Sequence, residues 1–316
     1  MKVLCIGEAL IDMICTDRGT SVSRGQNFLK KAGGAPANVA AAIAALGLEV
    51  DMAAKVGKDP FGQHITDLLN EMGVNTKWVI QDPNYFTTFA FVSLMEDGER
   101  DFYFNRGADG QLSIEDLNGV ELSDYSIVHF GSATGFLPGP LQLAYTHLLE
   151  KAKKAGAIIS FDPNYRHLLF PSNTKSFIDQ CWPFIEQAHF FKLSDEEAIL
   201  ITGCDTVQHA AAALRKRSNA IFAITMGKEG TLLSVGDHLE MIGSISITPV
   251  DATGAGDAFV GAVLFQLIDS NPSLLESIQL DEWKKIISNA NKAGARTCEF
   301  MGAMEAFKHL NKTIFN

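Results

Sequence analysis

Short, continuous apolar runs alternate with helical patterns in the chain from about residue 126 onward. The runs cover residues 127–130, 157–161, 189–193 and 220–225. One helical stretch between them opens at Pro140 and stops at Gly156, residue types that favour the first position and the C-cap of a helix. Because continuous apolar strands are buried on both faces, this pattern predicts an α/β fold: a central, mostly parallel sheet covered by helices on both faces.

The first third of the chain follows a different pattern. Two strand-like runs, residues 87–94 and 100–105, flank Asp97-Gly98, which is a strong hairpin signal. Residues 15–31 are polar and lack helical periodicity. These segments predict strands of a second, smaller sheet that is inserted into the main domain.

We therefore predict a single domain, residues 1–316, in which insertions at approximately 12–31 and 84–106 form a small β-sheet lid. Phe89 and Phe91 lie on the same side of the second insertion, so one face of the lid is apolar. A small sheet cannot cover such a face alone, and it needs the main domain or a second subunit. The alternative is a pair of surface hairpins without a gating role.

The composition narrows the classes of protein that fit this pattern. The formal net charge is −11 over 316 residues, and no basic block follows a helical pattern, so neither nucleic acid nor an anionic membrane is an expected partner. No run reaches the roughly 18 apolar residues that a spanning helix needs. The five cysteines form no paired spacing, and the apolar run in residues 1–6 is too short for a secretion signal. Both features indicate a reduced, cytoplasmic protein.

The segment 250–262 carries the sharpest chemical signal. An apolar helical run follows it, so Gly254, Ala255 and Gly256 lie at a helix start. Small residues let a ligand approach the backbone there, and the unpaired amides together with the helix dipole favour an anion. Asp257 in the first turn is a candidate general base for a substrate hydroxyl, while these amides hold a transferring phosphoryl group. The alternative is that Asp257 is an ordinary helix-start carboxylate.

Two other phosphate-binding motifs are excluded. A dinucleotide fingerprint that begins at Gly254 requires a third glycine at position 259, which is Phe259. A dinucleotide-dependent oxidoreductase is therefore set aside. No G-x-x-x-x-G-K-[ST] pattern occurs in the chain, so a Walker-type phosphate loop is excluded too.

Residues 251–262 resemble the C-terminal signature of the PfkB carbohydrate kinases, the ribokinase type, and residues 32–40 resemble the N-terminal signature. The likeness runs from Gly7 to Gly302 and looks closest to the fructokinase branch. The stretches that carry this closer likeness are residues 31–40, 162–166, 192–197 and 226–230. The resemblance implies a ribokinase-like fold, and it implies transfer of the ATP γ-phosphoryl group to a primary hydroxyl of a sugar such as fructose, with Mg²⁺ bridging the phosphates.

The resemblance also implies a sugar-binding site. Its expected members are Asp12, Gly33, Gly34, Asn38, Arg106 and Arg166. Taken alone, the two glycines indicate a tight turn, Asn38 a helix cap and Asp12 a turn residue. Arg166 follows a strand end, where ligands bind in open parallel sheets, and its guanidinium suits phosphate. A loop salt bridge from Arg166 to Asp162 is the alternative.

A nucleotide site and two cation sites follow from the same resemblance. The expected nucleotide-binding residues are Thr225, Gly227, Gly230 and Asn291, although helical spacing alone makes Asn291 an exposed polar residue. Glu197 matches a glutamate that organises Mg²⁺ through water, while Ser194 stands in place of the family's asparagine, and the pair also fits an ordinary capping box. Asp251 and Thr253 match positions that help to bind a monovalent cation such as K⁺, and are otherwise turn formers.

This interpretation keeps several rivals open. Within the class, the acceptor is 2-keto-3-deoxygluconate, ribose or a nucleoside-like riboside instead of fructose. A rival from another class is a catalytically silent, sugar-binding sensor on the same fold, against which the intact Asp257 and its glycine turn speak. We expect a sugar and ATP as ligands, and the resemblance implies a homodimer because lids of this kind pair between subunits in relatives.

Overall fold

The computed structural model describes residues 1–95 and 100–315, and two β-sheets organise them. The larger sheet has nine described strands in the order β13-β12-β11-β10-β9-β8-β1-β4-β5. Their bounds are β1 (Val3–Ile6), β4 (Val50–Gly57), β5 (Asn75–Asp82), β8 (Ile127–Phe130), β9 (Ile158–Phe161), β10 (Phe190–Ser194), β11 (Ile221–Thr225), β12 (Thr231–Val235) and β13 (His238–Ile242). Strands from β11 to β5 pair in parallel, and β12 and β13 add an antiparallel edge. The predicted mostly parallel sheet is confirmed.

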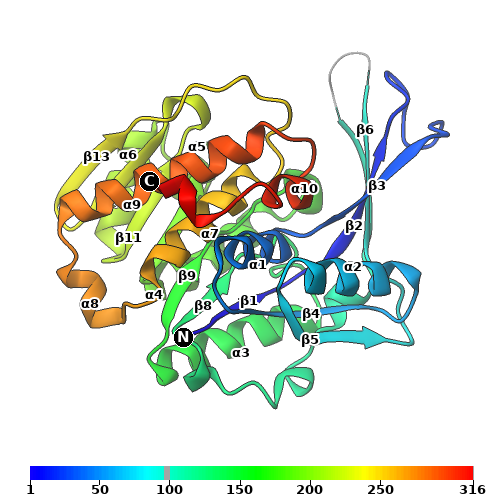
Figure 1. Cartoon of the computed structure of the whole chain (residues 1–316), viewed down its shortest axis with the longest axis horizontal. Coiled ribbons are helices and arrows are strands. Elements are labelled where there is room, and N and C mark those ends of the chain that lie inside the picture. The colour runs from blue at the N-terminus through cyan, green and yellow to red at the C-terminus, as the bar shows by residue number, and fades with distance from the viewer. Residues whose placement is uncertain (96–99, 316) are drawn as a thin grey trace.

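Helices cover both faces of the large sheet (Figure 1). One face packs against α1 (Ala35–Leu46), α2 (Pro60–Glu71), α7 (Ala255–Leu267), α8 (Pro272–Ser277), α9 (Leu280–Cys298) and α10 (Ala303–Phe307). The other face packs against α3 (Pro140–Ala155), α4 (Thr174–Gln187), α5 (Asp195–Thr202) and α6 (Val207–Arg217). Each layer forms its own buried apolar cluster with the strands, which explains why the strands read as continuous apolar runs.

Local signals account for the ends of α3. The helix begins at Pro140 and ends before Gly156, as predicted. Gly156 adopts φ 72°, and its amide faces the last carbonyls of the helix, a geometry that favours glycine. Because β1, β8, β9 and β10 are parallel neighbours, their carboxyl ends lie at one edge of the sheet, where ligands bind in folds of this kind.

The smaller sheet has four described strands in the order β3-β2-β6-β7 and rises from the main body at the upper right of Figure 1. Its strands are β2 (Leu10–Cys15), β3 (Phe28–Gly33), β6 (Phe89–Leu94) and β7 (Arg100–Asn105). The second insertion forms the predicted antiparallel hairpin, and the Asp97-Gly98 turn lies outside the described residues. Parallel pairing of β2 with β6, which the sequence did not indicate, joins the two insertions into one sheet.

The main body covers part of the aromatic face of the small sheet. Phe89 and Phe91 stack with ring centroids 5.9 Å apart, and Phe61 of α2 meets Phe89 edge-on at 4.8 Å. The same chain therefore covers Phe89. Phe91 instead contacts Tyr103 of β7, which is 57% exposed, so α2 covers only part of this face. The opposite face carries Ile14, Leu29 and Leu94, which are 39%, 42% and 56% exposed.

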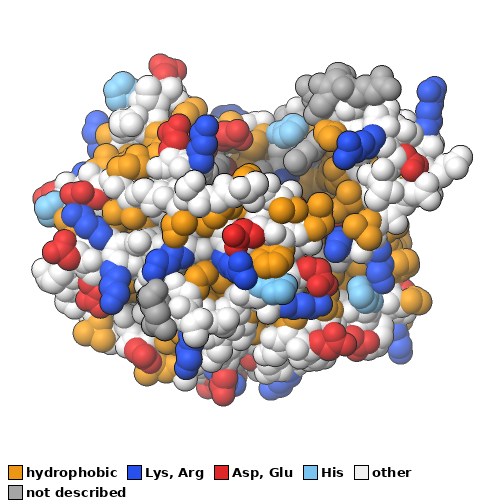
Figure 2. Space-filling view, turned by 45° about the horizontal axis from the view of Figure 1, so that its top comes forward, with side chains coloured by type: hydrophobic (Ala, Val, Ile, Leu, Met, Phe, Trp, Pro, Cys, Tyr) orange, Lys and Arg blue, Asp and Glu red, His pale blue; other side chains and the backbone are white. Residues whose placement is uncertain are grey.

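Charges of both signs are mixed on the surface of the protein. On the face drawn in Figure 2, Lys and Arg side chains are interspersed with Asp and Glu and form no continuous basic area. None of the described helices combines the length and the hydropathy that crossing a membrane requires.

Candidate active site

The first turn of α7 has the geometry of an anion site. Gly254 adopts φ 83°, and a β-carbon there would lie 2.5 Å from Ala303 Cβ, so the turn requires glycine. The amides of Gly256 and Asp257 donate to no acceptor among the described residues. Since both lie at the positive end of the helix dipole, they are free to bind an anion. Gly256 has no positive φ, so its backbone conformation does not by itself require glycine.

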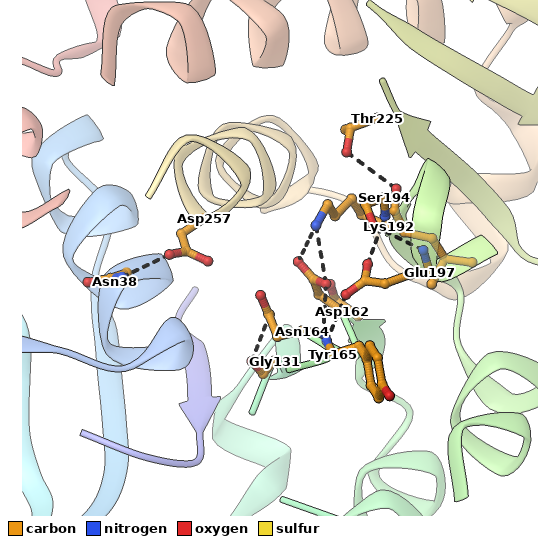
Figure 3. A network of polar contacts seen from close by, with 12 residues as sticks. Asn38, Gly131, Asp162, Asn164, Tyr165, Lys192, Ser194, Glu197, Thr225 and Asp257 are labelled. Atoms are coloured by element: carbon orange, nitrogen blue, oxygen red, sulfur yellow. Dashed lines mark hydrogen bonds and ion pairs between the residues drawn. The ribbon is translucent and has the colours of Figure 1, made fainter. Parts of the chain in front are cut away.

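Asp257 is buried beside this turn. Its Oδ2 accepts a hydrogen bond of 2.8 Å from Asn38 Nδ2, which joins the two signature segments across the core (Figure 3). Burial raises the pKa of Asp257, and the Asn38 hydrogen bond and the charges of Arg166 and Lys192 oppose that shift. The Oδ1 atom of Asn38 is buried and has no partner among the described residues. It could therefore accept a hydrogen bond from a hydroxyl group of a bound ligand.

The N-terminal signature places Asp12 against its glycines. A β-carbon at Gly33 would lie 2.2 Å from Asp12 Oδ2, and one at Gly34, which has φ 106°, would lie 2.4 Å from Glu8 O. Both glycines therefore serve close packing as well as a turn. Asp12 lies in β2 rather than in a turn, and burial raises its pKa to about 6 while the Arg166 charge opposes the shift.

Glu8 is a positioning residue that the sequence reasoning missed. It is 1% exposed and accepts hydrogen bonds from the amides of Ala35 and Ala133, at 3.2 and 3.3 Å, and from the Ser132 hydroxyl. It thus ties the end of β1 to the start of α1 and to the segment after β8. The available signal was a carboxylate two residues after a fully apolar strand, because a buried charge needs several donors.

Lys192 and Asp162 are a second pair that the sequence reasoning did not identify. Lys192 Nζ lies 3.1 Å from Asp162 Oδ2, and both side chains are buried (Figure 3). This contact also decides the alternative for Arg166, since Asp162 pairs with Lys192 instead.

The two arginines differ in what they contact. Arg166 is exposed and donates from Nη1 to Tyr165 O at 3.1 Å. Its charge partly offsets the burial that raises the pKa of Asp12 and of Asp257. Arg106 donates to the carbonyls of Pro138 and Thr134, at 2.7 and 3.2 Å. The Arg106 guanidinium therefore holds the segment after β8 in this structure.

The predicted nucleotide residues cluster where β11, β12 and α9 meet. Thr225 donates to Leu193 O at 3.3 Å, and Gly227 opens a short turn. Gly230 has φ 108°, and a β-carbon there would lie 2.2 Å from Ile242 O. Asn291 is buried rather than exposed, because its side chain accepts from Thr231 Oγ1 at 2.7 Å and donates to carbonyls at the end of β13. Helical spacing alone missed this contact with the sheet edge.

The expected cation-binding residues also make local hydrogen bonds. Ser194 and Glu197 form the capping box of α5, and Glu197 Oε1 accepts from the Tyr165 amide at 2.8 Å. Asp251 Oδ1 accepts from the amide and the hydroxyl of Thr253, at 2.9 and 2.7 Å. Both alternatives given by the sequence, a capping box and a turn, are thus present. Carboxylate oxygens keep further lone pairs, so these bonds are compatible with a cation, although no group of three His, Cys, Asp or Glu residues in the described part of the chain could hold a metal.

The layered sheet, the glycine turn at α7 and the buried carboxylate together define a phosphotransferase type of site. Comparison with known proteins gives the family: residues 1–308 match the model of the pfkB family carbohydrate kinases. The chain belongs to this family, and the prediction of a PfkB carbohydrate kinase is confirmed.

Similar proteins are mainly fructokinases. Fructokinase-1 of Oryza sativa subsp. japonica is 36% identical over 307 residues, which cover 96% of this chain and 93% of that protein. The fructokinase of Xylella fastidiosa with bound ATP superposes with a TM-score of 0.87 at 28% identity, covering 99% of this chain and 96% of that one. The fructokinase of Vibrio cholerae O395 with fructose, ADP and calcium ion gives 0.83 at 28% identity, covering 99% and 97%. An aminoimidazole riboside kinase from Salmonella enterica, with its riboside and an ATP analogue, gives 0.83 at 27% identity, covering 97% and 96%.

Proposed function

We propose that this chain is an ATP-dependent sugar kinase that transfers the γ-phosphoryl group of ATP to a primary hydroxyl of fructose. One observation carries the proposal: a buried carboxylate, Asp257, lies in the same helix turn as two amides without an acceptor among the described residues. A base for the hydroxyl and donors for the phosphoryl oxygens are thereby adjacent, as phosphoryl transfer requires.

In the proposed step, the sugar hydroxyl attacks the γ-phosphorus as its proton passes to Asp257. The bond between the γ-phosphorus and the β,γ-bridging oxygen breaks, and ADP leaves with the electron pair. From the sequence we expected the amides of residues 254–256 to stabilise the charge on the phosphoryl oxygens. Because the Ala255 amide donates to Ala252 O at 3.2 Å, we assign this role to the amides of Gly256 and Asp257. Burial favours proton uptake by Asp257, whereas the Asn38 amide orients its carboxylate.

The sugar would lie between the two signatures. Asp12 and Asn38 Oδ1 would accept hydrogen bonds from the sugar hydroxyls, and Gly33 and Gly34 would allow the sugar to approach closely. We place Arg166 at the boundary between sugar and phosphate because its charge acts on both Asp12 and Asp257. For Arg106 we propose that it shapes the sugar pocket by holding the segment after β8.

The nucleotide would lie over Thr225, Gly227, Gly230 and Asn291. Mg²⁺, when bound, would neutralise charge on the ATP phosphates, and we propose that Glu197 would hold one of its waters. Asp251 and Thr253 are the proposed ligands of a monovalent cation such as K⁺, whose charge would support the α7 turn. The Asp251 Oδ2 already fixes Gly302, at 2.8 Å from its amide, so a cation there would act through that turn.

Fructose is proposed as the acceptor because the relative from rice and the solved structures from Xylella and Vibrio are fructokinases. The riboside kinase from Salmonella, which is similarly close in structure, keeps a riboside as the second candidate. A silent sensor is disfavoured by the intact Asp257 and its turn.

The test is a kinase screen with ATP and Mg²⁺ against fructose, ribose, 2-keto-3-deoxygluconate and aminoimidazole riboside, with kcat/KM for each acceptor. We expect fructose to give the highest value, and Asp257→Asn serves as the inactive control in the same assay. If only a different acceptor gives product, that acceptor would replace fructose in the proposal, and the kinase activity would still stand. Sugar binding without ADP production would favour the sensor.

We further propose that the two insertions act as a lid, that the chain forms a homodimer and that it works in the cytoplasm. The exposed apolar side chains of Ile14, Leu29 and Leu94 support contact of the small sheet with a second subunit or with bound ligand. The scattered cysteines, which form no disulfide among the described residues, support a reducing compartment.

A further inference from the structure

Lys192 is a buried cation for which the reaction described above has no use. In β10, its neighbours Phe191 and Leu193 pack into the apolar cluster beneath α3 to α6, so Lys192 projects from the opposite face of the sheet, toward α7. The residue is 6% exposed. A buried ammonium destabilises a fold unless it is paired, so a lysine in a central strand needs a reason to be there.

Its pairing is incomplete. The ammonium lies 3.1 Å from Asp162 Oδ2 and 3.4 Å from Oδ1, so one carboxylate receives both contacts. Asp162 is the sole acceptor of Lys192 among residues 1–95 and 100–315. An ammonium has three N–H donors, and at least one therefore remains available to a ligand.

The open side of the ammonium faces the first turn of α7. A β-carbon at Gly256 would lie 3.4 Å from Lys192 Nζ, so the ammonium lies beside the unpaired amides of Gly256 and Asp257. Figure 3 shows Lys192 and Asp257 entering the same space from opposite sides, with Asp162 and Asn164 below them. A group bound to the α7 amides would be within reach of Lys192.

The charges around this space explain why a cation is needed. Burial alone lowers the pKa of Lys192, but the carboxylates of Asp162, Glu197 and Asp257 together raise it above its ordinary value. The side chain is therefore an ammonium at neutral pH. An incoming phosphate meets these same carboxylates, and Lys192 is the buried positive charge that offsets their repulsion.

We propose that the Lys192 ammonium binds a non-bridging oxygen of the γ-phosphoryl group during transfer and that Asp162 positions this ammonium. The proposal rests on the proposed kinase function. The bond from the γ-phosphorus to the bridging oxygen breaks, the sugar oxygen bonds to phosphorus, the hydroxyl proton passes to Asp257, and ADP leaves with the electron pair. Lys192 keeps its three protons throughout and acts by charge and hydrogen bonding.

A purely structural ion pair is the competing explanation. Replacing both members of such a pair by neutral residues often costs little stability, while removing one member is strongly destabilising. A structural pair would therefore tolerate the double variant Lys192→Met with Asp162→Asn. It would also affect ATP and ADP equally, since neither nucleotide would touch it.

The test compares nucleotides that differ only in the γ-phosphate. Calorimetric titrations without sugar measure the Kd of ADP and of the non-hydrolysable β,γ-imido analogue of ATP, both with Mg²⁺. We expect Lys192→Met to weaken the analogue roughly 10- to 100-fold, the usual worth of a charge-assisted hydrogen bond, and ADP far less. The kcat for sugar phosphorylation should fall about 10²- to 10³-fold. Lys192→Arg keeps the charge and should recover part of both losses.

The double variant keeps the test decisive if Lys192→Met alone fails to fold, because it leaves no unpaired buried carboxylate at residue 162. Loss of binding to the analogue but not to ADP in the double variant supports the γ-phosphate contact. Equal weakening of both nucleotides, or near wild-type kcat in the double variant, overturns the role of Lys192 and leaves the kinase intact. A wild-type chain that binds neither nucleotide overturns the kinase function itself.

Discussion

The start of α7 and the small four-stranded sheet are built in opposite ways. The α7 turn lies against the core: Gly261 of α7 packs against Ala42 of α1, and Gly294 of α9 lies so close to Ala255 that a β-carbon there would be 3.1 Å from its carbonyl oxygen. The small sheet instead has one face on α2, and the other exposes Ile14 and Leu29.

The two regions are therefore expected to differ in rigidity: neighbouring elements fix the α7 site, whereas the small sheet can change its position. Groups that must hold a fixed geometry, such as Asp257 and Lys192, project from elements buried on all sides, where neighbours lock their rotamers. The small sheet has fewer neighbours, so it is the region whose position a ligand can change at low cost. Substitutions at the α7 turn should therefore act on turnover, whereas changes at the small sheet should act on binding and assembly.

The largest expected effect is that of Asp257→Asn on turnover. The variant should fold and bind ATP, while kcat falls roughly 10²- to 10⁴-fold, the usual contribution of a positioned general base. KM should change little if the carboxylate acts chiefly in the transition state. Steady-state kinetics and circular dichroism provide the measurement.

The matched control is Asp281→Asn, since Asp281 is also a first-turn carboxylate, but of α9, with a side chain that is 98% exposed. It should keep full kcat and lose at most a few tenths of a kcal/mol of helix-dipole stabilisation. Equal kinetics for both variants would reduce Asp257 to an ordinary helix-start carboxylate.

The two glycines of the α7 turn should separate stability from activity. Gly254→Ala forces a left-handed φ on a residue with a β-carbon and crowds Ala303, so the free energy of unfolding should fall by at least about 1–2 kcal/mol. Gly256→Val has no such strain, but its side chain would meet the Lys192 ammonium and cover the anion site. It should keep its Tm within a few degrees while kcat/KM drops about 10²-fold.

Thermal denaturation and kinetics on the same preparations measure both. The comparison breaks if Gly256→Val phosphorylates sugar as well as wild type, because the backbone amides would then not hold the phosphoryl group.

The third prediction concerns pH and the sugar side of the site. Burial raises the pKa of Asp12 to about 6, so the free enzyme carries its carboxylate ionised above pH 6 and protonated below it. A proton on Asp12 removes an acceptor for the sugar hydroxyls. As the pH falls below 6, kcat/KM for sugar should therefore decline, by up to about tenfold per pH unit, with KM for ATP unaffected.

Asp12→Asn should lower kcat/KM at neutral pH and abolish this limb of the profile. An unchanged limb in Asp12→Asn would assign it to another carboxylate, of which Asp257 is the first candidate.

Local sequence signals were sufficient for much of the fold and for the α7 turn. The apolar runs indicated the parallel strands, and Pro140 and Gly156 marked the ends of α3, since these are properties of neighbouring residues. The glycine turn before Asp257 was visible for the same reason. The two signatures were then sufficient for the family, which the comparisons confirm.

Contacts between distant segments were not visible. The buried Glu8 and the Lys192–Asp162 pair depend on which strands are neighbours, and the spacing of residues carries no information on that order. Asn291 looked exposed because helical spacing does not show that β12 and β13 close over α9. The parallel pairing of β2 with β6, which places Asp12 opposite Ala90, was hidden for the same reason.

The last and smallest expected effect is on the small sheet itself. If the insertions close over the sugar, amide hydrogen exchange in β2 and β6 should slow on adding fructose, because closure protects the strand amides, whereas exchange in β9 and β10 should change little. The variant Leu94→Ser removes an exposed apolar side chain at the end of β6, where Leu94 pairs with Arg100 of β7, so it tests the contacts of this face of the small sheet. If a second subunit covers that face, wild type should have a mass near twice 34.3 kDa by light scattering, and Leu94→Ser should shift it toward the monomer. Unchanged exchange at saturating fructose would contradict the proposal of a lid, and a monomeric wild type at micromolar concentration would contradict the proposal of a dimer. Neither result would change the chemistry proposed for the α7 site.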